Sequence, residues 1–289
     1  MCIRDSLDAA LTTPQLETAA RQNRSLITGL KEQSKASPTP QPPVFVGFEN
    51  GMGLLVETLV NSVSEADTRT NTPVTAITRD TDNLVVSTQQ ASIKCDAVIL
   101  ATPAHQAAHL LASCQPAADR LSSIEHASVA LVTMGFKRSD VRHSLDGSGM
   151  LIPRGEGLLA TAVSWGSSKW PHWADEEHVI LRVSAGRAGD TRALALDDNE
   201  LVETLLTEVA NILEIEGDLV EWRVSRWIDA FPQYAPGHDR LVAAIDRDLR
   251  SDMSGLFLAG AGYKGIGIPA CINQGTQSAE ATLDYLKTL

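Results

Sequence analysis

The stretch that decides the fold is Leu256-Phe-Leu-Ala-Gly-Ala-Gly-Tyr-Lys-Gly-Ile-Gly-Ile-Pro-Ala-Cys-Ile-Asn-Gln-Gly275, close to the end of the chain. It opens with an apolar run that is typical of a buried strand, and glycines then recur until Pro269. Glycine lets the backbone come very close to a neighbour, and proline suits the first turn of a helix because its missing N–H costs nothing there. The stretch therefore predicts a strand, a glycine-rich turn and a helix from Ala270 to the end of the chain.

A turn of this kind can serve a cofactor. The first N–H groups of a helix lack partners within the helix and carry a partial positive charge, which suits a phosphate or the anionic edge of a reduced flavin. An ordinary connection between a strand and a helix can contain the same glycines. The glycine content alone leaves both interpretations open.

The residues before the turn predict a parallel sheet. Residues 97–101 are an apolar run ended by Thr102 and Pro103, as expected for a strand covered on both faces in an α/β sheet, and a short helix follows over 104–111. Two further strands are predicted over 74–77 and 84–88. Before them, 44–48 is a strand candidate, and Gly51-Met-Gly53 leads into a helix over 54–60. The start of the chain has helical spacing over 7–31, followed by a proline-rich linker over 37–43.

The middle of the chain predicts a second, sheet-based domain. Strand candidates over 129–136, 158–163 and 179–184 follow one another with no long helical pattern between them. Asp197 and Asp198 can cap a helix over 200–213, and another strand is predicted over 221–227.

Composition narrows the classes of function. The chain has 289 residues, of which 43% are hydrophobic, and a formal net charge of −12, so it can bury a sizeable core and lacks the basic surface of a nucleic-acid-binding protein. Its four cysteines show no CxxC spacing, which favours neither a zinc site nor a disulfide framework and fits a reducing, cytosolic setting. No apolar run approaches the roughly 20 residues that span a bilayer, and peripheral contact with a membrane stays open.

No constellation of polar residues predicts a metal site or a hydrolase. His105 and His109 are four residues apart on a predicted helix, but the sequence offers no third ligand beside them, and we interpret them as surface residues. The acidic runs at 175–177 and 197–198 are interpreted as solvated charge and helix caps, and no GxSxG motif occurs.

The first six residues, Met1-Cys-Ile-Arg-Asp-Ser6, are what ATG TGT ATA AGA GAC AG and a final pyrimidine encode. This resembles the transposon-end adaptor used in sequencing libraries, so we expect residues 1–6 to be an artefact joined to a gene fragment. The alternative is a natural N-terminus with the same residues.

Several motifs together resemble a known family. The segment from Leu256 to Ile272 resembles the C-terminal flavin-contacting segment of bacterial protoporphyrinogen/coproporphyrinogen oxidases, FAD-dependent enzymes of the amine-oxidase-like flavoprotein superfamily. Four other segments match the family in order: Phe48-Glu-Asn-Gly-Met-Gly-Leu-Leu55, Asp96-Ala-Val-Ile-Leu-Ala-Thr-Pro-Ala104, Ala162-Val-Ser-Trp-Gly-Ser-Ser-Lys-Trp-Pro-His172, and the stretch from Arg226 that contains Phe231-Pro-Gln-Tyr-Ala-Pro-Gly-His238. The GxGIPxCI and PQYxxGH elements are the specific ones.

This resemblance implies an α/β fold, namely the C-terminal part of a Rossmann-like FAD-binding domain with an inserted sheet-based (α+β) substrate domain. The implied organisation is an artefact over 1–6, a helical remnant and linker over 7–43, an FAD-domain segment over 44–115, a substrate-binding domain over 116–235 and the return to the FAD domain over 236–289. The family begins with a strand, a GxGxxG turn and a helix that hold the pyrophosphate, and this chain does not begin with them. By itself, the chain is therefore predicted to bind FAD poorly or not at all.

The resemblance also implies the cofactor contacts. The backbone of Val74 would meet the adenine end of FAD, Gly260 and Ala261 would lie near the ribityl-phosphate region, and Ile266, Gly267 and Ile268 would contact the isoalloxazine ring, with Trp227 packed near the flavin. Without the resemblance, Val74 would be interpreted as a core residue of a strand, and Trp227 could equally be a core residue.

In the family, the flavin takes hydride equivalents from a porphyrinogen, either protoporphyrinogen IX or coproporphyrinogen III, and passes them to oxygen or another acceptor. This substrate is broad, apolar and carboxylate-bearing, so the inserted domain is expected to offer an apolar cavity with cations at its rim. The residues present identify no catalytic acid or base. A different flavin amine oxidase or desaturase, or a non-catalytic fragment, are the alternatives. The expected location is the cytoplasm, or the inner face of the cell membrane as a peripheral protein.

Overall fold

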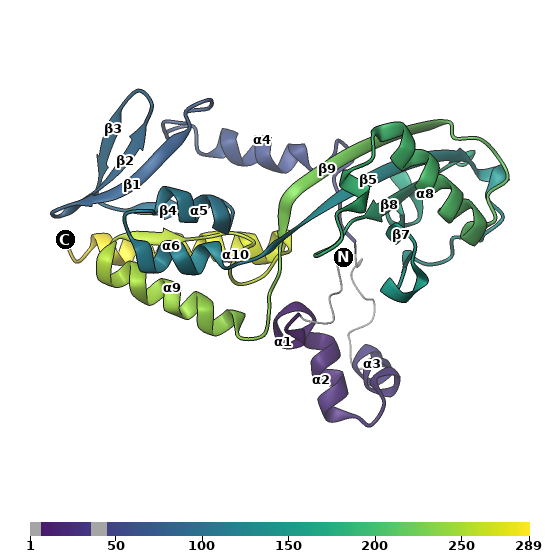
Figure 1. Cartoon of the computed structure of the whole chain (residues 1–289), viewed down its shortest axis with the longest axis horizontal. Helices are drawn as coiled ribbons and strands as arrows, with labels where there is room; N and C mark the ends of the chain where they lie inside the picture. Colours follow the sequence, from purple (N-terminus) through teal and green to yellow (C-terminus); the bar gives the residue numbers. More distant parts are fainter. Residues whose placement is uncertain (1–6, 36–44) are drawn as a thin grey trace. The chain divides into compact units, whose positions relative to one another are not determined.

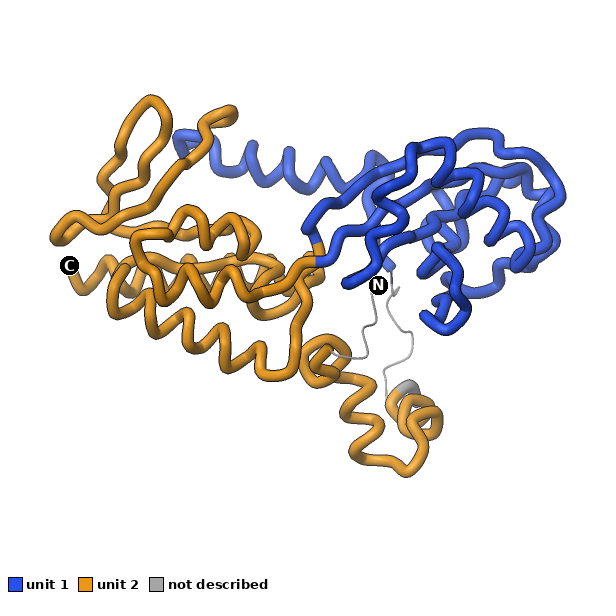
Figure 2. The backbone as a smooth tube through the Cα atoms, in the orientation of Figure 1, with its two compact units in different colours: residues 1–3, 38–68, 127–230 blue, residues 4–37, 69–126, 231–289 orange. Residues whose placement is uncertain are grey.

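The structure, a computed structural model, describes residues 7–35 and 45–289. The predicted artefact over 1–6 and the predicted linker over 37–43 lie outside these residues. The chain forms two compact units (Figure 2). Of the described residues, unit 1 contains 45–68 and Ala127–Ala230, and unit 2 contains 7–35, Arg69–His126 and Phe231–Leu289. The helical spacing over 7–31 is confirmed by α1 (Ala9–Thr12), α2 (Pro14–Gln22) and α3 (Leu26–Lys35).

The boundaries of the two units differ from the predicted domain boundaries. The predicted segment 44–115 is split, because its first part packs within unit 1. The ring centroid of Phe45 lies 6.0 Å from that of Trp170, and a Cβ at Gly47 would lie 3.1 Å from the indole of Trp170. The predicted helix over 54–60 is present as α4 (Gly53–Ser62), also in unit 1. The predicted cofactor and substrate roles of the domains stay predictions.

Unit 1 is built on a five-stranded sheet with the order β6-β7-β8-β5-β9. Figure 1 labels β7, β8, β5 and β9 of this sheet. The pairs β6–β7, β7–β8 and β8–β5 are antiparallel. The strands are β5 (His126–Lys137), β6 (Gly149–Leu151), β7 (Ala160–Trp165), β8 (His178–Ala185) and β9 (Glu221–Pro232). The predicted sheet in the middle of the chain and the predicted strand at 221–227 are thus confirmed.

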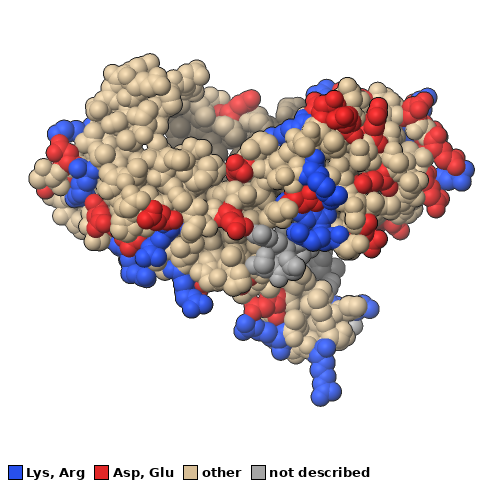
Figure 3. Space-filling view, viewed as in Figure 1, with Lys and Arg blue, Asp and Glu red and all other residues tan. Residues whose placement is uncertain are grey.

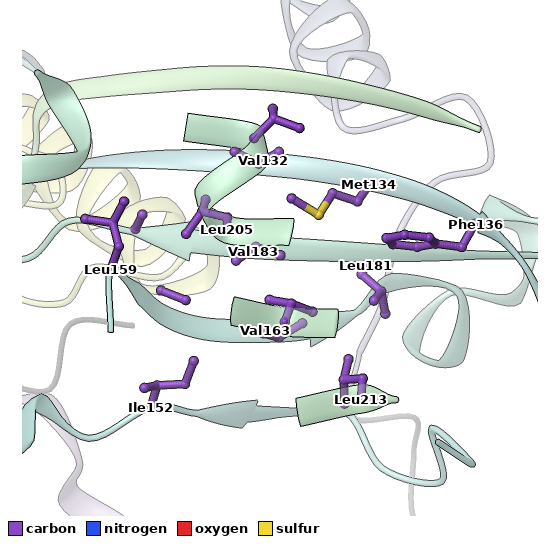
Figure 4. Packing of buried hydrophobic residues seen from close by; sticks show 14 of the residues in the cluster. Val132, Met134, Phe136, Ile152, Leu159, Val163, Leu181, Val183, Leu205 and Leu213 are labelled. Carbon is purple, nitrogen blue, oxygen red and sulfur yellow. The ribbon is translucent and has the colours of Figure 1, made fainter. Parts of the chain in front are cut away.

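One face of this sheet packs against helix α8 (Asp198–Leu213). Alternate residues of β8 are buried, so Leu181 and Val183 face the core, where Leu205 and Leu213 of α8 meet them (Figure 4). The predicted cap at Asp197 is confirmed, because its carboxylate accepts the Glu200 N–H and the Glu200 carboxylate accepts the Asp197 N–H. The helix begins at Asp198, two residues before the predicted start. Short helical turns join the strands: α7 (Gly166–Lys169), η1 (Arg138–Asp140), η2 (Arg154–Glu156), η3 (Pro171–Trp173) and η4 (Arg192–Leu194).

Unit 2 contains a parallel pair of strands, β4 (Val98–Leu100) and β10 (Leu256–Leu258), in which Leu256 is opposite Val98 and Leu258 is opposite Leu100. Both strands and their parallel arrangement agree with the predicted α/β unit. The expected cover on both faces is incomplete in the described residues, because Ile99 is 39% exposed.

The remaining elements of unit 2 surround this pair. Strands β1 (Val74–Asp80), β2 (Asn83–Thr88) and β3 (Ser92–Cys95) form an antiparallel meander. The helices are α5 (Ala104–Leu110), α6 (Gln115–Ser122), α9 (His238–Asp252) and α10 (Ile268–Leu286). Helix α9 is not among the elements inferred from the sequence, although Val242, Ile245 and Leu249 recur at helical spacing and are buried.

No helix of the described residues combines the length and the apolar character needed to cross a membrane. On the face that Figure 3 shows, basic and acidic side chains are interspersed, and a wide area carries neither. Helix α9 illustrates this mixture, since Arg247 and Arg250 alternate with Asp246 and Asp248.

Candidate functional site

The glycine-rich turn between β10 and α10 lies at the carboxyl ends of the two parallel strands. The Ala259 N–H donates to the Leu100 carbonyl over 3.1 Å, which continues the pairing of β10 with β4 into the turn. Gly260 and Gly265 adopt φ values of +127° and +130°, which residues with a side chain rarely adopt. In open α/β sheets, ligands bind outside the carboxyl ends of the strands. This turn is therefore the candidate site of unit 2.

A buried tyrosine holds the turn from beneath. The Tyr234 hydroxyl donates to the Ala261 carbonyl over 2.7 Å and accepts the Gly265 N–H over 2.8 Å, so one oxygen bridges the two sides of the turn. Its ring stacks on His238 with centroids 4.0 Å apart and an interplanar angle of 12°. Burial is the main cause that raises the pKa of Tyr234, which keeps its hydroxyl protonated and able to donate.

Two further side chains bond to the backbone of the turn. His238 Nε2 lies 3.1 Å from the Tyr263 carbonyl, so this nitrogen carries the proton of the neutral ring. Burial, the largest effect on His238, lowers its pKa and favours that neutral form. The Gln274 amide accepts the Lys264 N–H over 3.3 Å and donates to the Gly265 carbonyl over 3.2 Å. The turn is thus a rigid cradle rather than a loose loop.

The end of the turn presents backbone donors and apolar side chains to the outside. Gly267 is the N-cap of α10 and has no capping side chain, so the first N–H groups of the helix lack a side-chain partner. Ile266 and Ile268, on either side of it, are 41% and 50% exposed. Beyond strand β4, the buried Thr102 hydroxyl has no hydrogen-bond partner among the described residues. Unsatisfied donors, an orphaned hydroxyl and exposed apolar groups at one sheet end fit a group with anionic and flat apolar parts, such as a flavin dinucleotide.

The structure brings together five of the seven residues predicted to contact the cofactor. Gly260, Ala261, Ile266, Gly267 and Ile268 all belong to the β10–α10 turn or the first residue of α10. The other two lie elsewhere. Val74 is the first residue of β1 in the meander of unit 2 and is 37% exposed, and Trp227 is in β9 of unit 1 and is 50% exposed. Their cofactor contacts stay predictions.

The side chains that hold the turn were not predicted as site residues from the sequence. Tyr234 and His238 both belong to the PQYxxGH element, which the sequence marks as specific to the resembling family but to which no role is assigned there. Residues 260–265 also have the spacing GxGxxG and follow a strand, close to the end of the chain and not at its start. Helix α10 begins only at Ile268, so the third glycine lies before the helix and serves the turn.

The histidine, cysteine and acidic side chains of the described residues form no candidate metal centre. No cluster of three or more His, Cys, Asp or Glu side chains among them has the arrangement of a metal site. Cys95, Cys114 and Cys271 are free thiols, and His105 lies edge-on to His126 with ring centroids 4.7 Å apart.

Comparison with known proteins agrees with this architecture. A family model described as flavin containing amine oxidoreductase matches residues 2–283. The chain is 30% identical over 288 residues to coproporphyrinogen III oxidase of Bacillus subtilis, covering 98% of this chain and 61% of that protein. It is 29% identical to coproporphyrinogen III oxidase of Staphylococcus aureus, covering 98% of this chain and 62% of that protein.

A solved structure supports the same relationship. A protein from Exiguobacterium sp. 255-15, provisionally assigned as a protoporphyrinogen oxidase, superposes with a TM-score of 0.82 at 27% identity, covering 98% of this chain and 61% of that one. The chain thus spans about three fifths of the length of the relatives that it matches. With a family match over nearly all of its residues, the chain belongs to the flavin containing amine oxidoreductase family.

Proposed function

We propose that the whole protein oxidises a porphyrinogen to the corresponding porphyrin with FAD as cofactor, in haem biosynthesis. The observation that carries this proposal is the 30% identity to a coproporphyrinogen III oxidase along 98% of the chain. The names of the two bacterial relatives favour coproporphyrinogen III over protoporphyrinogen IX as the substrate. The electron acceptor is oxygen or another oxidant, and the expected location is the cytoplasm or the inner face of the cell membrane.

FAD would supply the acceptor of hydride equivalents, because no side chain of a protein performs that chemistry. The described residues would hold and orient it. The backbone of Gly260 and Ala261 leaves room beside the Ala101 carbonyl, which would lie 4.0 Å from a Cβ at Gly260. Ile266 and Ile268 would offer an apolar surface to a flat ring, and the N-terminus of α10 would stabilise negative charge on it.

The turn needs no catalytic acid or base of its own in this proposal. Tyr234, His238 and Gln274 are positioning residues, since each bonds to the backbone of the turn and none is exposed at its outer surface. Their part would be to keep the backbone donors in place and to exclude water from beneath the site.

The present chain is proposed to be the C-terminal part of this enzyme and inactive alone. The first step of the test is the genomic DNA upstream of the codon for Leu7, in search of an open frame that encodes a strand, a GxGxxG turn and a helix. The second is expression of the extended protein and of the present chain in parallel. We expect the extended protein to purify with bound flavin and to form coproporphyrin from coproporphyrinogen III, measured by porphyrin absorbance, and the present chain to do neither.

Two outcomes favour the alternatives. Turnover of amines or carotenoids, without turnover of porphyrinogens, would identify another flavin oxidase or desaturase on the same fold. A stop codon and a start signal directly upstream of Leu7, with no flavin bound by the expressed chain, would favour a non-catalytic protein.

A further inference from the structure

The five-stranded sheet of unit 1 has a second face, opposite α8, that carries polar side chains. Along β8, the buried residues Leu181 and Val183 face the core, so Arg182 between them faces the other side. Arg182 is opposite Ser164 of β7 and Thr133 of β5 in the strand register, and directly opposed residues share a face of a sheet. Arg182 and Ser164 therefore lie side by side on the face away from α8.

Lys169 joins them from helix α7. Its Nζ donates to the Ser164 hydroxyl over 2.5 Å, and Lys169 and Arg182 are both half-buried. Burial, followed by the positive charge of Arg182, lowers the pKa of Lys169. Two cations thus share a partly desolvated place, and Ser164 adjoins both of them.

Within the part of the chain that the structure describes, neither cation has an acidic partner. Some other arginines of unit 1 form ion pairs, for example Arg192 with Asp190 and Arg226 with Asp198. Among residues 7–35 and 45–289, no carboxylate forms an ion pair or a hydrogen bond with Lys169 or Arg182. Two half-buried like charges repel each other unless an anion lies between or beside them. An anion bound beside both cations would relieve this repulsion.

The surroundings of the two cations are aromatic. Lys169 Nζ lies 4.6 Å from the ring centroid of Phe45 and 5.8 Å from that of Trp170, and the Arg182 guanidinium lies 5.9 Å from that of Trp173. Trp170 and Trp173 stack with centroids 4.6 Å apart. Rings beside cations suit a ligand in which an anionic group is attached to a broad apolar body, and the two positive charges disfavour a cationic amine.

We propose that Lys169 and Arg182, with the Ser164 hydroxyl, form a carboxylate-binding site that takes a carboxylate arm of a porphyrin-type macrocycle. The site rests on the proposed function and adds the residues that recognise the substrate. The carboxylate accepts hydrogen bonds from the ammonium and the guanidinium, and the apolar body of the ligand packs on the neighbouring rings. Both bonds are charge-assisted, the strong class of hydrogen bond.

The test uses the chain as it exists and coproporphyrin III, a stable tetracarboxylate porphyrin, as the probe. Binding is measured by quenching of tryptophan fluorescence and by calorimetry, with the tetramethyl ester of coproporphyrin as the uncharged probe. The variants are Lys169→Met, Arg182→Met and the double variant, with Arg192→Met as a matched control, because Arg192 belongs to the same unit and is already paired with Asp190. Lys169→Arg tests rescue by a retained charge.

We expect each single variant to bind coproporphyrin about 10-fold more weakly, and the double variant roughly 100-fold more weakly, since each loses a charge-assisted bond. The control and Lys169→Arg should bind like the parent, and the ester should bind parent and double variant equally. Melting temperatures should not fall, because each variant relieves repulsion between like charges. A residue with a merely structural role would lower the melting temperature and weaken binding of the ester as well.

Two results would overturn the site. One is a dissociation constant of the double variant for coproporphyrin within about twofold of that of the parent. The two cations would then not bind the carboxylate of the porphyrin. The other is an absence of coproporphyrin binding by the parent chain. Should the double variant not fold, the two single variants and Lys169→Arg still decide. If these variants bind coproporphyrin normally but the extended enzyme turns over porphyrinogen, only the site is refuted. If the extended enzyme turns over amines alone, the proposed function is refuted, even if these cations bind carboxylates.

Discussion

Replacement of Tyr234 by phenylalanine removes one oxygen from beneath the glycine-rich turn and leaves the ring. That oxygen donates to the Ala261 carbonyl over 2.7 Å and accepts the Gly265 N–H over 2.8 Å, and the side chain is 2% exposed. The phenylalanine ring keeps the stacking on His238, so the variant isolates the two hydrogen bonds from the packing. It tests whether the turn is a rigid cradle.

The size of the effect follows from the groups left without partners. A buried polar group that loses its hydrogen bond costs about 1–3 kcal/mol, and Tyr234→Phe leaves one carbonyl and one N–H in this state. Gly265 is half-buried, so water can satisfy part of the loss, and we expect a decrease in the free energy of unfolding of about 2–4 kcal/mol. This corresponds to a decrease in melting temperature of roughly 4–12 °C.

The matched control is Tyr263→Phe. Tyr263 is in the same turn and is 4% exposed, but its hydroxyl has no hydrogen-bond partner among the described residues. Its removal should leave stability unchanged or raise it by up to about 1 kcal/mol. Thermal and urea unfolding, followed by circular dichroism, measure both variants, and hydrogen exchange of the Gly265 amide should accelerate only in Tyr234→Phe. Equal effects of the two substitutions would refute the account of the turn.

Three further predictions concern single contacts. Burial lowers the pKa of His238 from its ordinary 6.5, so just below pH 6.5 the imidazole is protonated in the unfolded chain but not in the folded one. The free energy of unfolding should therefore decrease as the pH falls below 6.5, and urea titrations of His238→Gln should show a weaker dependence on pH. Gly265→Ala should lower the free energy of unfolding by about 1–3 kcal/mol, because its Cβ would lie 2.6 Å from the Ala270 Cβ at a φ of +130°. Gly275→Ala, which has open space around it, should raise the free energy of unfolding by about 0.5–1 kcal/mol, and equal changes in thermal unfolding would contradict this. Glu208→Gln should cost about 2–3 kcal/mol in urea unfolding, because the carboxylate accepts the N–H groups of Leu159 and Ala160, each over 2.8 Å, and an unchanged midpoint would exclude a role for these bonds.

Local patterns of the sequence were sufficient for most of the elements. The apolar run at 97–101, the glycines after Leu258 and the cap at Asp197 each predict an element that the structure contains, because strand burial, turn conformation and helix capping depend on neighbouring residues. Helix α9 is not predicted, although Val242, Ile245 and Leu249 lie on one buried face. Charged residues outnumber the apolar ones in this helix, so the apolar periodicity is weak in the sequence.

The candidate site was predictable only in part. The glycine turn is recognisable in the sequence because glycine itself permits the backbone conformations that the turn needs. The resemblance to a flavoprotein family indicated that the turn contacts a flavin. Tyr234 and His238 are separated from Gly265 by more than twenty residues of chain, so only the packing of α9 beneath the turn shows that they hold it.

The sequence by itself determined the family, the strand–turn–helix that ends the chain, the sheet-based segment in its middle and the flavin as the expected cofactor. The tertiary structure alone decided that residues 45–68 pack with the sheet unit and that Tyr234 bridges Ala261 and Gly265. It also decided that Lys169 and Arg182 both lie beside Ser164, with no acidic partner among the described residues. The physical reason is the range of the interactions. Turns, caps and strand periodicity are set by adjacent residues, whereas a bridging hydroxyl or an unpaired charge is defined by neighbours that folding brings from elsewhere in the chain.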